Sequence, residues 1–201
     1  MKIKLFLLAV LYFVCVIVLA HFFVPPNYDW TQNTISDLAS QGHVYKGIMQ
    51  AGFIGFGGLL TVGTAVYFSK NRRAFFLLFV AVYGLSILFS GIFCTTPIDP
   101  SMPFSAGESR LHSLFATTAG IAMSLGILWQ VAASSNNSQR WTRLAFFIMI
   151  IEISGLFGLV ENHILNLDKG IIQRALYLAG LAWLIYEERM LNWEREIQNE
   201  R

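Results

Sequence analysis

The stretch AFFLLFVAVYGLSILFSGIFC, residues Ala74–Cys94, is 21 residues long and contains no charged side chain. A helix of about 20 apolar residues crosses the roughly 30 Å hydrocarbon core of a bilayer. A backbone surrounded by lipid must satisfy its own hydrogen bonds, and this long run lacks the alternation typical of a barrel strand. The stretch therefore predicts a transmembrane helix.

Five further apolar stretches flank this one. They bring the predicted spans to six, near Ile3–Val24, Gly47–Phe68, Ala74–Cys94, His112–Ala133, Trp141–Ile164 and Ile171–Tyr186. Only 13% of the 201 residues are charged, about half of the roughly 25% that is usual in soluble domains. The connections leave no room for a soluble domain. We therefore expect one all-α domain over residues 1–201, a polytopic six-helix transmembrane bundle, with residues 187–201 as a cytoplasmic helical extension.

The lysines and arginines predict how the bundle is oriented. The side of the membrane with the two termini holds ten of them, and the other side holds four. Cytoplasmic loops carry the excess of positive charge, so both termini are expected in the cytoplasm of a multi-pass protein of the cell (inner or plasma) membrane. The net charge of +2 is too small to indicate nucleic acid. The expected partner is membrane lipid.

The first span has a second interpretation. The basic residues Lys2 and Lys4 followed by an apolar run ending at Ala20 also resemble a secretory signal. The apolar core of a signal is usually shorter, about 7–15 residues, so a retained first helix is favoured; cleavage would leave five spans. Cys15 is expected at mid-depth and Cys94 at the outer end of a span, which makes a disulfide between them unlikely on geometry.

The outer connections collect the ionisable groups. All four histidines, His21, His43, His112 and His163, lie there or at their edges, together with the acidic residues Asp29, Asp37, Asp99, Glu108, Glu161 and Asp168. Ionisable groups are costly near a bilayer, so a one-sided layer of them indicates a functional site. The layer is equally compatible with a network that clamps the outer loops to the bundle.

The first outer connection contains Asn33-Thr-Ile-Ser-Asp-Leu38. Asn33 can cap a short interfacial helix, and Thr34 with Asp37 resembles a capping box in which Asp replaces Glu. The alternative, functional interpretation is that Ser36 and Asp37 project into the mouth of the bundle.

The second outer connection places Asp99 in a Pro-x-Asp-Pro turn before a helix that carries Arg110 and His112. Two residues are separated by about 200° on a helix, so only one of this pair can face the bundle. His112 shares its face with Ala116 and Gly120, small residues that favour close helix packing. We therefore expect His112 to point inward and Arg110 to meet lipid headgroups.

The third outer connection groups Glu161 and His163 with Gln173 and Arg174, and Arg174 is the expected ion-pair partner of Glu161. Glu152 lies near mid-bilayer, where an unpaired carboxylate is costly, so it is expected to face the interior in a protonated form. Two stripes of small residues predict tight helix packing, namely Gly47, Ala51, Gly55 and Gly58, and Ala116, Gly120 and Ser124.

Two kinds of catalysis are compatible with these residues. Ser36 could act as a nucleophile with His112 as its base and Asp99 or Asp37 orienting the imidazole. Alternatively, a metal such as Zn²⁺ could be held with an open position for an activated water, the candidate ligands being His43, His112, His163 and Asp99. No local metal motif such as His-Glu-x-x-His occurs. A binding site without catalysis would use Asn33, Asp37, His43, Glu161, His163 and Arg174.

Three motifs together suggest a family. They are Asn33–Leu38 after the first span, Gly91-Ile-Phe followed by Pro97-x-Asp99 after the third, and His112 at the start of the fourth. With the six-span layout they resemble the bacterial domain of unknown function 998 family over nearly the whole chain, and more distantly the Frag1/DRAM/Sfk1 membrane proteins. The resemblance implies an architecture and positions to watch (Asn33, Ser36, Asp37, Asp99 and His112), but no activity. Here the segment before Asp99 is a few residues longer than the family's usual Gly-Phe-Pro.

Three functions follow from this pattern, in order of preference. The first is binding of a lipid or small amphiphile in an outer-facing polar mouth. The second is an outer-facing intramembrane hydrolase or transferase that acts on a lipid, with or without a metal. The third is a small transporter, for which Glu152 is the candidate mid-membrane residue. Whether the protein is an enzyme stays open on the sequence.

Overall fold

The computed structural model describes residues 4–25, 27–70 and 75–199, and this part of the chain is helical without any strand. Its elements are α1 (Leu5–Ala20), η1 (His21–Phe23), η2 (Ser36–Ala39), α2 (Lys46–Lys70), α3 (Phe76–Ile92), α4 (Ala106–Ala133), α5 (Asn137–Glu161) and α6 (Lys169–Asn199), where η marks a 3₁₀-helix. The predicted all-α fold with six long helices is confirmed.

Four of these helices are long and apolar enough to cross a membrane: α1 with η1, α2, α4 and α5. α3 is apolar but shorter, with 17 residues. α4 begins six residues before the predicted span because the side chain of Ser105 accepts a hydrogen bond from the backbone of Glu108 and caps the helix. α6 continues as a helix to Asn199 through most of the predicted extension.

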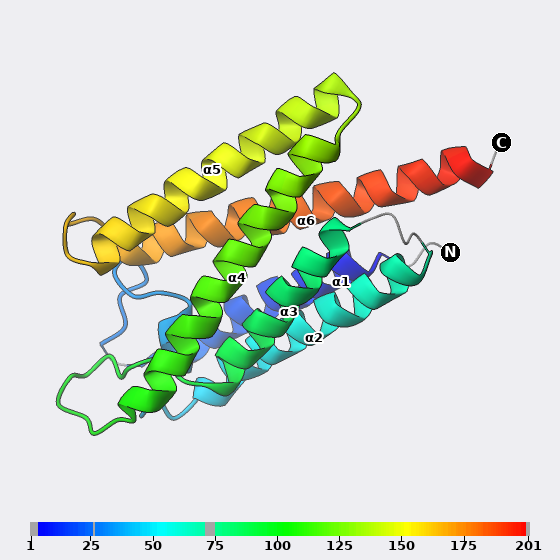
Figure 1. Ribbon diagram of the computed structural model, residues 1–201. Coiled ribbons are helices and arrows are strands. Elements are labelled where there is room, and N and C mark those ends of the chain that lie inside the picture. The colour runs from blue at the N-terminus through cyan, green and yellow to red at the C-terminus, as the bar shows by residue number, and fades with distance from the viewer. Residues whose placement is uncertain (1–3, 26, 71–74, 200–201) are drawn as a thin grey trace.

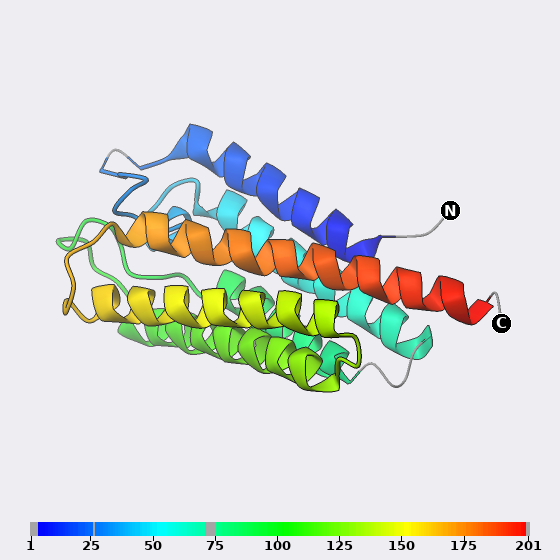
Figure 2. The ribbon, with the colours of Figure 1, turned by 90° about the horizontal axis from the view of Figure 1, so that it is seen from above.

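The six long helices follow one another around the bundle in chain order. Each helix packs against the next one, and α6 returns to α1. Both described ends of the chain lie at the same end of the bundle, which we call the terminal end (Figures 1 and 2). The connections 27–45, 93–105 and 162–168 gather at the opposite end, which we call the loop end. The predicted polar connections are therefore close together in space.

Glycines set the closest approach between α2 and α3. A Cβ on Gly57 would overlap the carbonyl oxygen of Gly84, and a Cβ on Gly91 would lie 2.6 Å from Cβ of Phe53. Of the stripe predicted on the second span, Gly55 meets the ring of Tyr12 on α1, whereas Gly47 has no neighbour within 4 Å. At Gly57 and Gly91 the backbones of α2 and α3 therefore lie in close contact, as is usual where small residues meet between membrane helices.

The stripe predicted on the fourth span was assigned to packing, and this was wrong. Ala116 is exposed, and a Cβ on Gly120 would meet nothing within 4 Å. The reason is that α4 and α5 are close together where they are joined, and diverge toward the loop end (Figure 1). The face of α4 that carries Ala116 and Gly120 is therefore left uncovered there.

At the terminal end, Glu187 of α6 is buried and joins three helices. Arg143 of α5 donates to its two carboxylate oxygens, from Nε at 2.7 Å and from Nη2 at 2.8 Å. Gln130 of α4 donates to the same carboxylate at 2.9 Å, and the indole of Trp183 donates at 3.2 Å. Because the carboxylate and the guanidinium are both buried, their pairing and hydrogen bonds compensate for the loss of hydration.

The next residue, Glu188, is also buried and connects α6 to α1 and α2. Its carboxylate accepts hydrogen bonds from the backbone N–H groups of Phe6 (2.8 Å) and Leu7 (2.9 Å) and from the hydroxyl of Tyr67 (2.6 Å). The first N–H groups of a helix have no partner within the helix, and its N-terminal end favours a negative charge. Glu188 thus caps α1 from α6. The sequence analysis had placed both glutamates in the helical extension 187–201, outside the bundle, and had not predicted these contacts.

Candidate functional site

His112 points into the bundle, as predicted, and is 5% exposed. Its Nδ1 lies 2.8 Å from the carbonyl oxygen of Ser90 and 3.0 Å from that of Phe93, so Nδ1 carries a hydrogen and donates to the end of α3. One turn earlier on α4, the carboxylate of Glu108 accepts from the backbone N–H of Cys94 at 2.9 Å. Two side chains on one face of α4 therefore hold the C-terminal end of α3.

Gln50 of α2 completes this helix end. Its side-chain amide donates to the carbonyl oxygens of Gly91 at 3.1 Å and of Ile92 at 3.4 Å, and lies 3.4 Å from the sulfur of Cys94. The last carbonyl groups of a helix have no partner within the helix, and leaving them unpaired away from water is costly. Gln50 and His112 together satisfy these groups where the short helix α3 ends.

The first connection forms the predicted capping box. The hydroxyl of Thr34 accepts from the backbone N–H of Asp37 at 3.1 Å, and the carboxylate of Asp37 accepts from the N–H of Thr34 at 2.7 Å. Asn33 has a different partner, since its side-chain oxygen accepts from the N–H of Asp29 at 2.8 Å. Asp37 is therefore engaged in local structure at the start of η2.

Ser36 is buried and lies beside Gln173 of α6. The amide of Gln173 donates to the Ser36 hydroxyl at 3.4 Å, and its oxygen accepts from the N–H of Ile35 at 2.7 Å. The side chain of Gln173 thus attaches the first connection to α6. The sequence gives a weak signal for this contact, because a glutamine near the end of an apolar run needs a polar partner.

Arg174, also on α6, is the centre of the contacts made by the first connection. It donates to the carbonyl oxygen of Asn33 at 2.9 Å, to Nε2 of His21 at 3.1 Å and to the hydroxyl of Tyr28 at 2.5 Å. Its guanidinium also lies 5.9 Å from the ring centroid of Trp30. His21 is a suitable acceptor at Nε2 because its Nδ1 is 2.7 Å from a backbone carbonyl oxygen and so carries the hydrogen.

The prediction of an ion pair between Glu161 and Arg174 is wrong. Glu161 pairs instead with Lys169, whose Nζ lies 3.0 Å from the carboxylate. Lys169 is the first residue of α6 and lies directly across the short connection, whereas Arg174 is one turn deeper and bonds to the first connection. The Glu161 side chain is about half exposed, so this pair contributes little to stability.

Gly170 allows the first connection to lie against the start of α6. A Cβ at this position would be 2.6 Å from the carbonyl oxygen of Trp30 and 2.7 Å from that of Thr31, and would overlap that of Asn33. The backbone N–H of Ile171 donates to the Thr31 carbonyl at 3.2 Å. The loop carbonyls therefore approach the N-terminal end of α6 at a distance that only glycine permits.

Asp99, His43 and His163 lie apart from these contacts. The carboxylate of Asp99 accepts from the N–H and the hydroxyl of Ser101, and these hydrogen bonds hold the pKa of Asp99 below its usual value. His43 lies edge-on to the ring of Tyr45, and burial lowers its pKa despite an opposing hydrogen bond to the backbone of Phe23. His163 is exposed and has a left-handed backbone with φ of 58°.

The residues predicted to form a catalytic or metal site are therefore distributed among separate contacts. No hydrogen bond within the described ranges joins Ser36, Asp99 and His112 to one another. Within the same ranges, no group of three or more His, Cys, Asp or Glu side chains has an arrangement that could hold a metal ion. His112 ends α3, Ser36 lies where the first connection meets α6, and Asp37 belongs to the local capping box.

A surface at the loop end is left uncovered by the residues that the structure describes. Ser113, Ala116, Thr117 and Gly120 of α4 define it, and we call it the open face of α4. The first three are exposed, and Gly120 has no neighbour within 4 Å of an added Cβ. Ala116 and Gly120 lie seven residues, or two turns, before Met123 and Ile127. Those two residues are buried, so the same helical face is covered near the terminal end and uncovered near the loop end.

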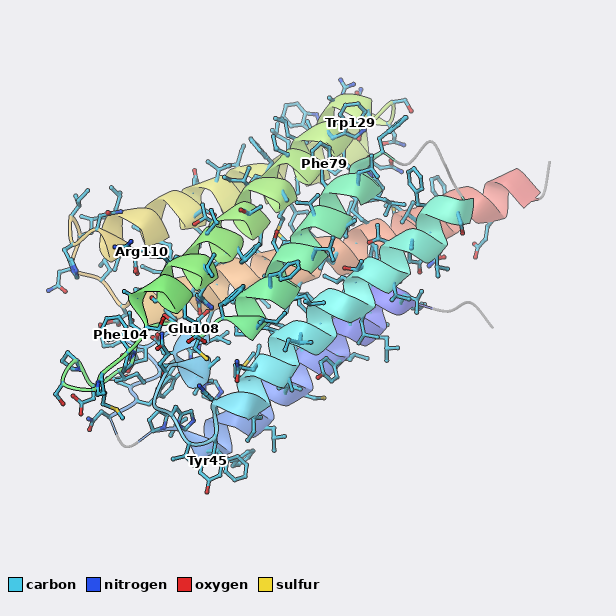
Figure 3. All side chains as sticks on the ribbon, turned by 60° about the horizontal axis from the view of Figure 1, so that its bottom comes forward. Tyr45, Phe79, Phe104, Glu108, Arg110 and Trp129 are labelled. Atoms are coloured by element: carbon cyan, nitrogen blue, oxygen red, sulfur yellow. The ribbon has the colours of Figure 1, made fainter. Side chains whose placement is uncertain are left out.

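A positively charged residue, Arg110, lies next to the open face of α4. Arg110 is exposed and lies one turn toward the loop end from Ser113. Figure 3 shows Arg110 on the side of α4 nearer α5, and Glu108 toward the end of α3. The prediction that His112 points inward and Arg110 outward is confirmed.

Glu152 does not face the interior, contrary to the expectation from the sequence. It is exposed near the middle of α5, on the side away from the buried residues Arg143 and Ile150. On the inner side of α5, nearer the terminal end, Phe146 packs on Tyr186 and Arg143 binds Glu187.

The helices and their apolar surfaces define the class of the molecule, which is a helical membrane protein. Residues 7–186 match the model of a family described as "Protein of unknown function (DUF998)". The chain belongs to this family, which confirms the resemblance seen in its motifs. No curated protein and no solved structure matches the chain.

Proposed function

We propose that the protein binds a lipid or similar amphiphile on the outer side of the cell membrane, with its acyl chain against the open face of α4. The observation that carries this proposal is that Ala116 and Gly120 are uncovered on a face whose next two turns are buried. Ala116 and Gly120 have the smallest side chains, and a Cβ added at Gly120 would meet nothing within 4 Å, so an acyl chain can lie against this side of α4. Dispersion contacts along that length favour an extended apolar ligand.

The headgroup is expected near Arg110. An exposed arginine at the end of a span lies at the depth of lipid headgroups, and its guanidinium suits phosphate in a two-pronged geometry. Arg110 is one turn outside the open face, so a phosphate bound there would direct its acyl chain toward Ser113 and Gly120. A phospholipid is therefore the ligand class that we favour.

The orientation belongs to the same proposal. By position in the sequence, ten of the fourteen lysines and arginines fall on the side of the two termini, which favours cytoplasmic termini and an outer loop end. Exposed aromatic residues lie at both ends, with Trp30 and Tyr45 at the loop end and Trp129 and Trp141 toward the terminal end. Figure 3 shows Tyr45 and Trp129 at these two ends. Such aromatic belts are typical of membrane interfaces.

The experiment is native mass spectrometry of protein purified in mild detergent, with the bound lipid identified after release. Wild type is expected to retain a phospholipid, and Gly120→Leu to lose it, with Kd weakened by about tenfold or more for the loss of roughly 1.4 kcal/mol of contact. Gly47→Leu is the matched control, because a Cβ at Gly47 also meets nothing within 4 Å but lies on α2. Equal lipid retention in wild type and both variants would contradict the proposal.

Arg110→Gln tests the headgroup contact separately. It is expected to lower retention of lipids with an anionic phosphate and to leave the melting temperature unchanged, since Arg110 is exposed. Lys169→Gln is the control, because Lys169 is another cation at the loop end whose partner is Glu161. The same loss of lipid in both variants would point to general surface charge and not to a site at Arg110.

A further inference from the structure

The uncovered side of α5 carries a regular seam. It consists of residues spaced alternately by four and three, all of them exposed: Trp141, Ala145, Ile148, Glu152, Gly155, Leu159 and Asn162. Spacing of this kind places side chains on one line along a helix and is the repeat by which two helices pack with interlocking side chains. We call these residues the α5 seam. Only 11% of the most apolar window of α5 is buried, the smallest share among the four long apolar helices.

Glu152 lies in the middle of this seam. It is residue 16 of the 25 in α5, and the bundle itself does not cover it. A carboxyl group facing hydrocarbon is expensive, and such residues are normally found paired or facing protein. Apart from Asn162, which directly follows the last residue of α5, the seam is thus an apolar surface with one polar group, Glu152, that needs a partner at the same depth.

We propose that the α5 seam is a dimer interface and that its occupant is the α5 seam of a second copy of this chain. Two copies inserted in the same membrane run parallel, and a twofold axis along the seam places each residue opposite its own counterpart. Glu152 then meets Glu152, where a protonated carboxyl group in one copy donates a hydrogen bond to the carboxylate of the other. This pairing gives each Glu152 carboxyl group a hydrogen-bond partner, which lipid would not provide.

The neighbours of Glu152 favour the same geometry. Ala145 and Gly155 are small, and a Cβ on Gly155 would meet nothing within 4 Å. Small residues on a seam let two helix backbones approach closely, and a single polar residue within such a repeat fixes the register of the two helices. Ile148 and Leu159 add apolar contacts on either side.

The seam lies apart from the lipid surface proposed above. Glu152 and Gly155 are on α5, whereas the open face belongs to α4. Substitutions on one surface therefore serve as controls for the other. The dimer proposal does not rest on lipid binding, and either can fail alone.

The first test is disulfide cross-linking of the full chain in native membranes under mild copper phenanthroline oxidation. Cys15→Ser removes the exposed native cysteine, while the buried Cys94 is kept. Ile148→Cys is expected to cross-link two copies. Met149→Cys is the matched control, because it is exposed at the same depth but about 100° away around α5. Equal cross-linking at both positions, or none at Ile148, would overturn the proposal.

The second test measures the monomer–dimer equilibrium by single-molecule photobleaching in phosphatidylcholine vesicles at several protein densities. Glu152→Leu is expected to weaken association by about threefold to thirtyfold, the range for one hydrogen bond between membrane helices. Glu152→Gln keeps a side chain that can pair with itself and is expected to stay dimeric. Gly155→Leu is expected to give monomers, and Gly120→Leu dimers. A wild type that is monomeric at every density would contradict the inference.

Discussion

Glu187 and Glu188 are adjacent in α6, are 0% and 2% exposed, and hold opposite halves of the bundle. Glu187 binds Arg143 on α5, and Glu188 caps the N-terminal end of α1. Because neighbouring residues on a helix point about 100° apart, one short segment can serve both sides. α6 therefore connects the N-terminal helix α1 to α5.

Replacing Glu188 tests this role. Glu188→Ala would leave the N–H groups of Phe6 and Leu7 and the hydroxyl of Tyr67 without their acceptor. We expect a loss of about 2–3 kcal/mol in the free energy of unfolding, measured by thermal or denaturant unfolding in detergent. Glu161→Ala, which breaks an exposed pair with Lys169, is expected to cost less than about 1 kcal/mol. Similar losses in both variants would contradict a special role for Glu188.

The pair of Arg143 and Glu187 predicts a characteristic double-mutant result. Arg143→Met alone leaves a buried carboxylate without its cation and is expected to cost about 3–5 kcal/mol. Adding Glu187→Leu removes that carboxylate, and the double variant is expected to recover much of the loss. The comparison needs the free energies of unfolding of both single variants and the double variant. Simple additivity would show that the two side chains act independently.

Gly170 and Gly107 make a matched pair, since each is the second residue of a helix. Gly170→Ala places a methyl group against the carbonyl oxygens of Trp30 and Thr31, so the first connection must move. We expect a lower melting temperature and faster proteolysis within residues 27–35. Gly107→Ala meets only the Ser105 hydroxyl at 3.9 Å and is expected to be neutral or stabilising by up to about 1 kcal/mol. The reverse order would contradict the contact.

The lowered pKa of His43 predicts that the stability of the folded protein depends on pH. Burial lowers its pKa in the folded protein, so the unfolded chain binds more protons near that pKa and folding is favoured as pH rises. This contribution is present above the ordinary histidine pKa of about 6.5 and is lost as pH falls through the lowered value. Between about pH 7.5 and about pH 5.5, the melting temperature of wild type is expected to fall more than that of His43→Gln. An identical fall in both would remove His43 as the cause.

The sequence was sufficient for the helices and for some local contacts. Long uncharged runs determine helices in lipid, and the capping box of Thr34 and Asp37 is local, so both could be read directly from the order of residues. The spacing of Arg110 and His112 showed that only one of them can face the bundle. His112 is that residue, although Ala116 and Gly120, by which it was chosen, are uncovered. These features depend on helical geometry over a few residues.

Contacts between distant segments could not be read in this way. Arg174 could reach either Glu161 or the first connection, and only the fold decides that it binds Asn33 and Tyr28. Ala116 and Gly120 suggested packing, but the divergence of α4 from α5 uncovers them. Such outcomes depend on how long helices cross, which is set by side chains far apart in the chain.

Photolabelling is the measurement that best shows whether the open face of α4 binds an amphiphile. A phospholipid with a photoactivatable acyl chain would be added to the protein in vesicles, and the labelled residues mapped by peptide mass spectrometry. We expect saturable labelling concentrated on Ser113, Ala116 and Thr117 that unlabelled lipid competes away and Gly120→Leu removes. Labelling spread evenly over lipid-facing positions such as Leu85 and Leu178, without saturation, would contradict it.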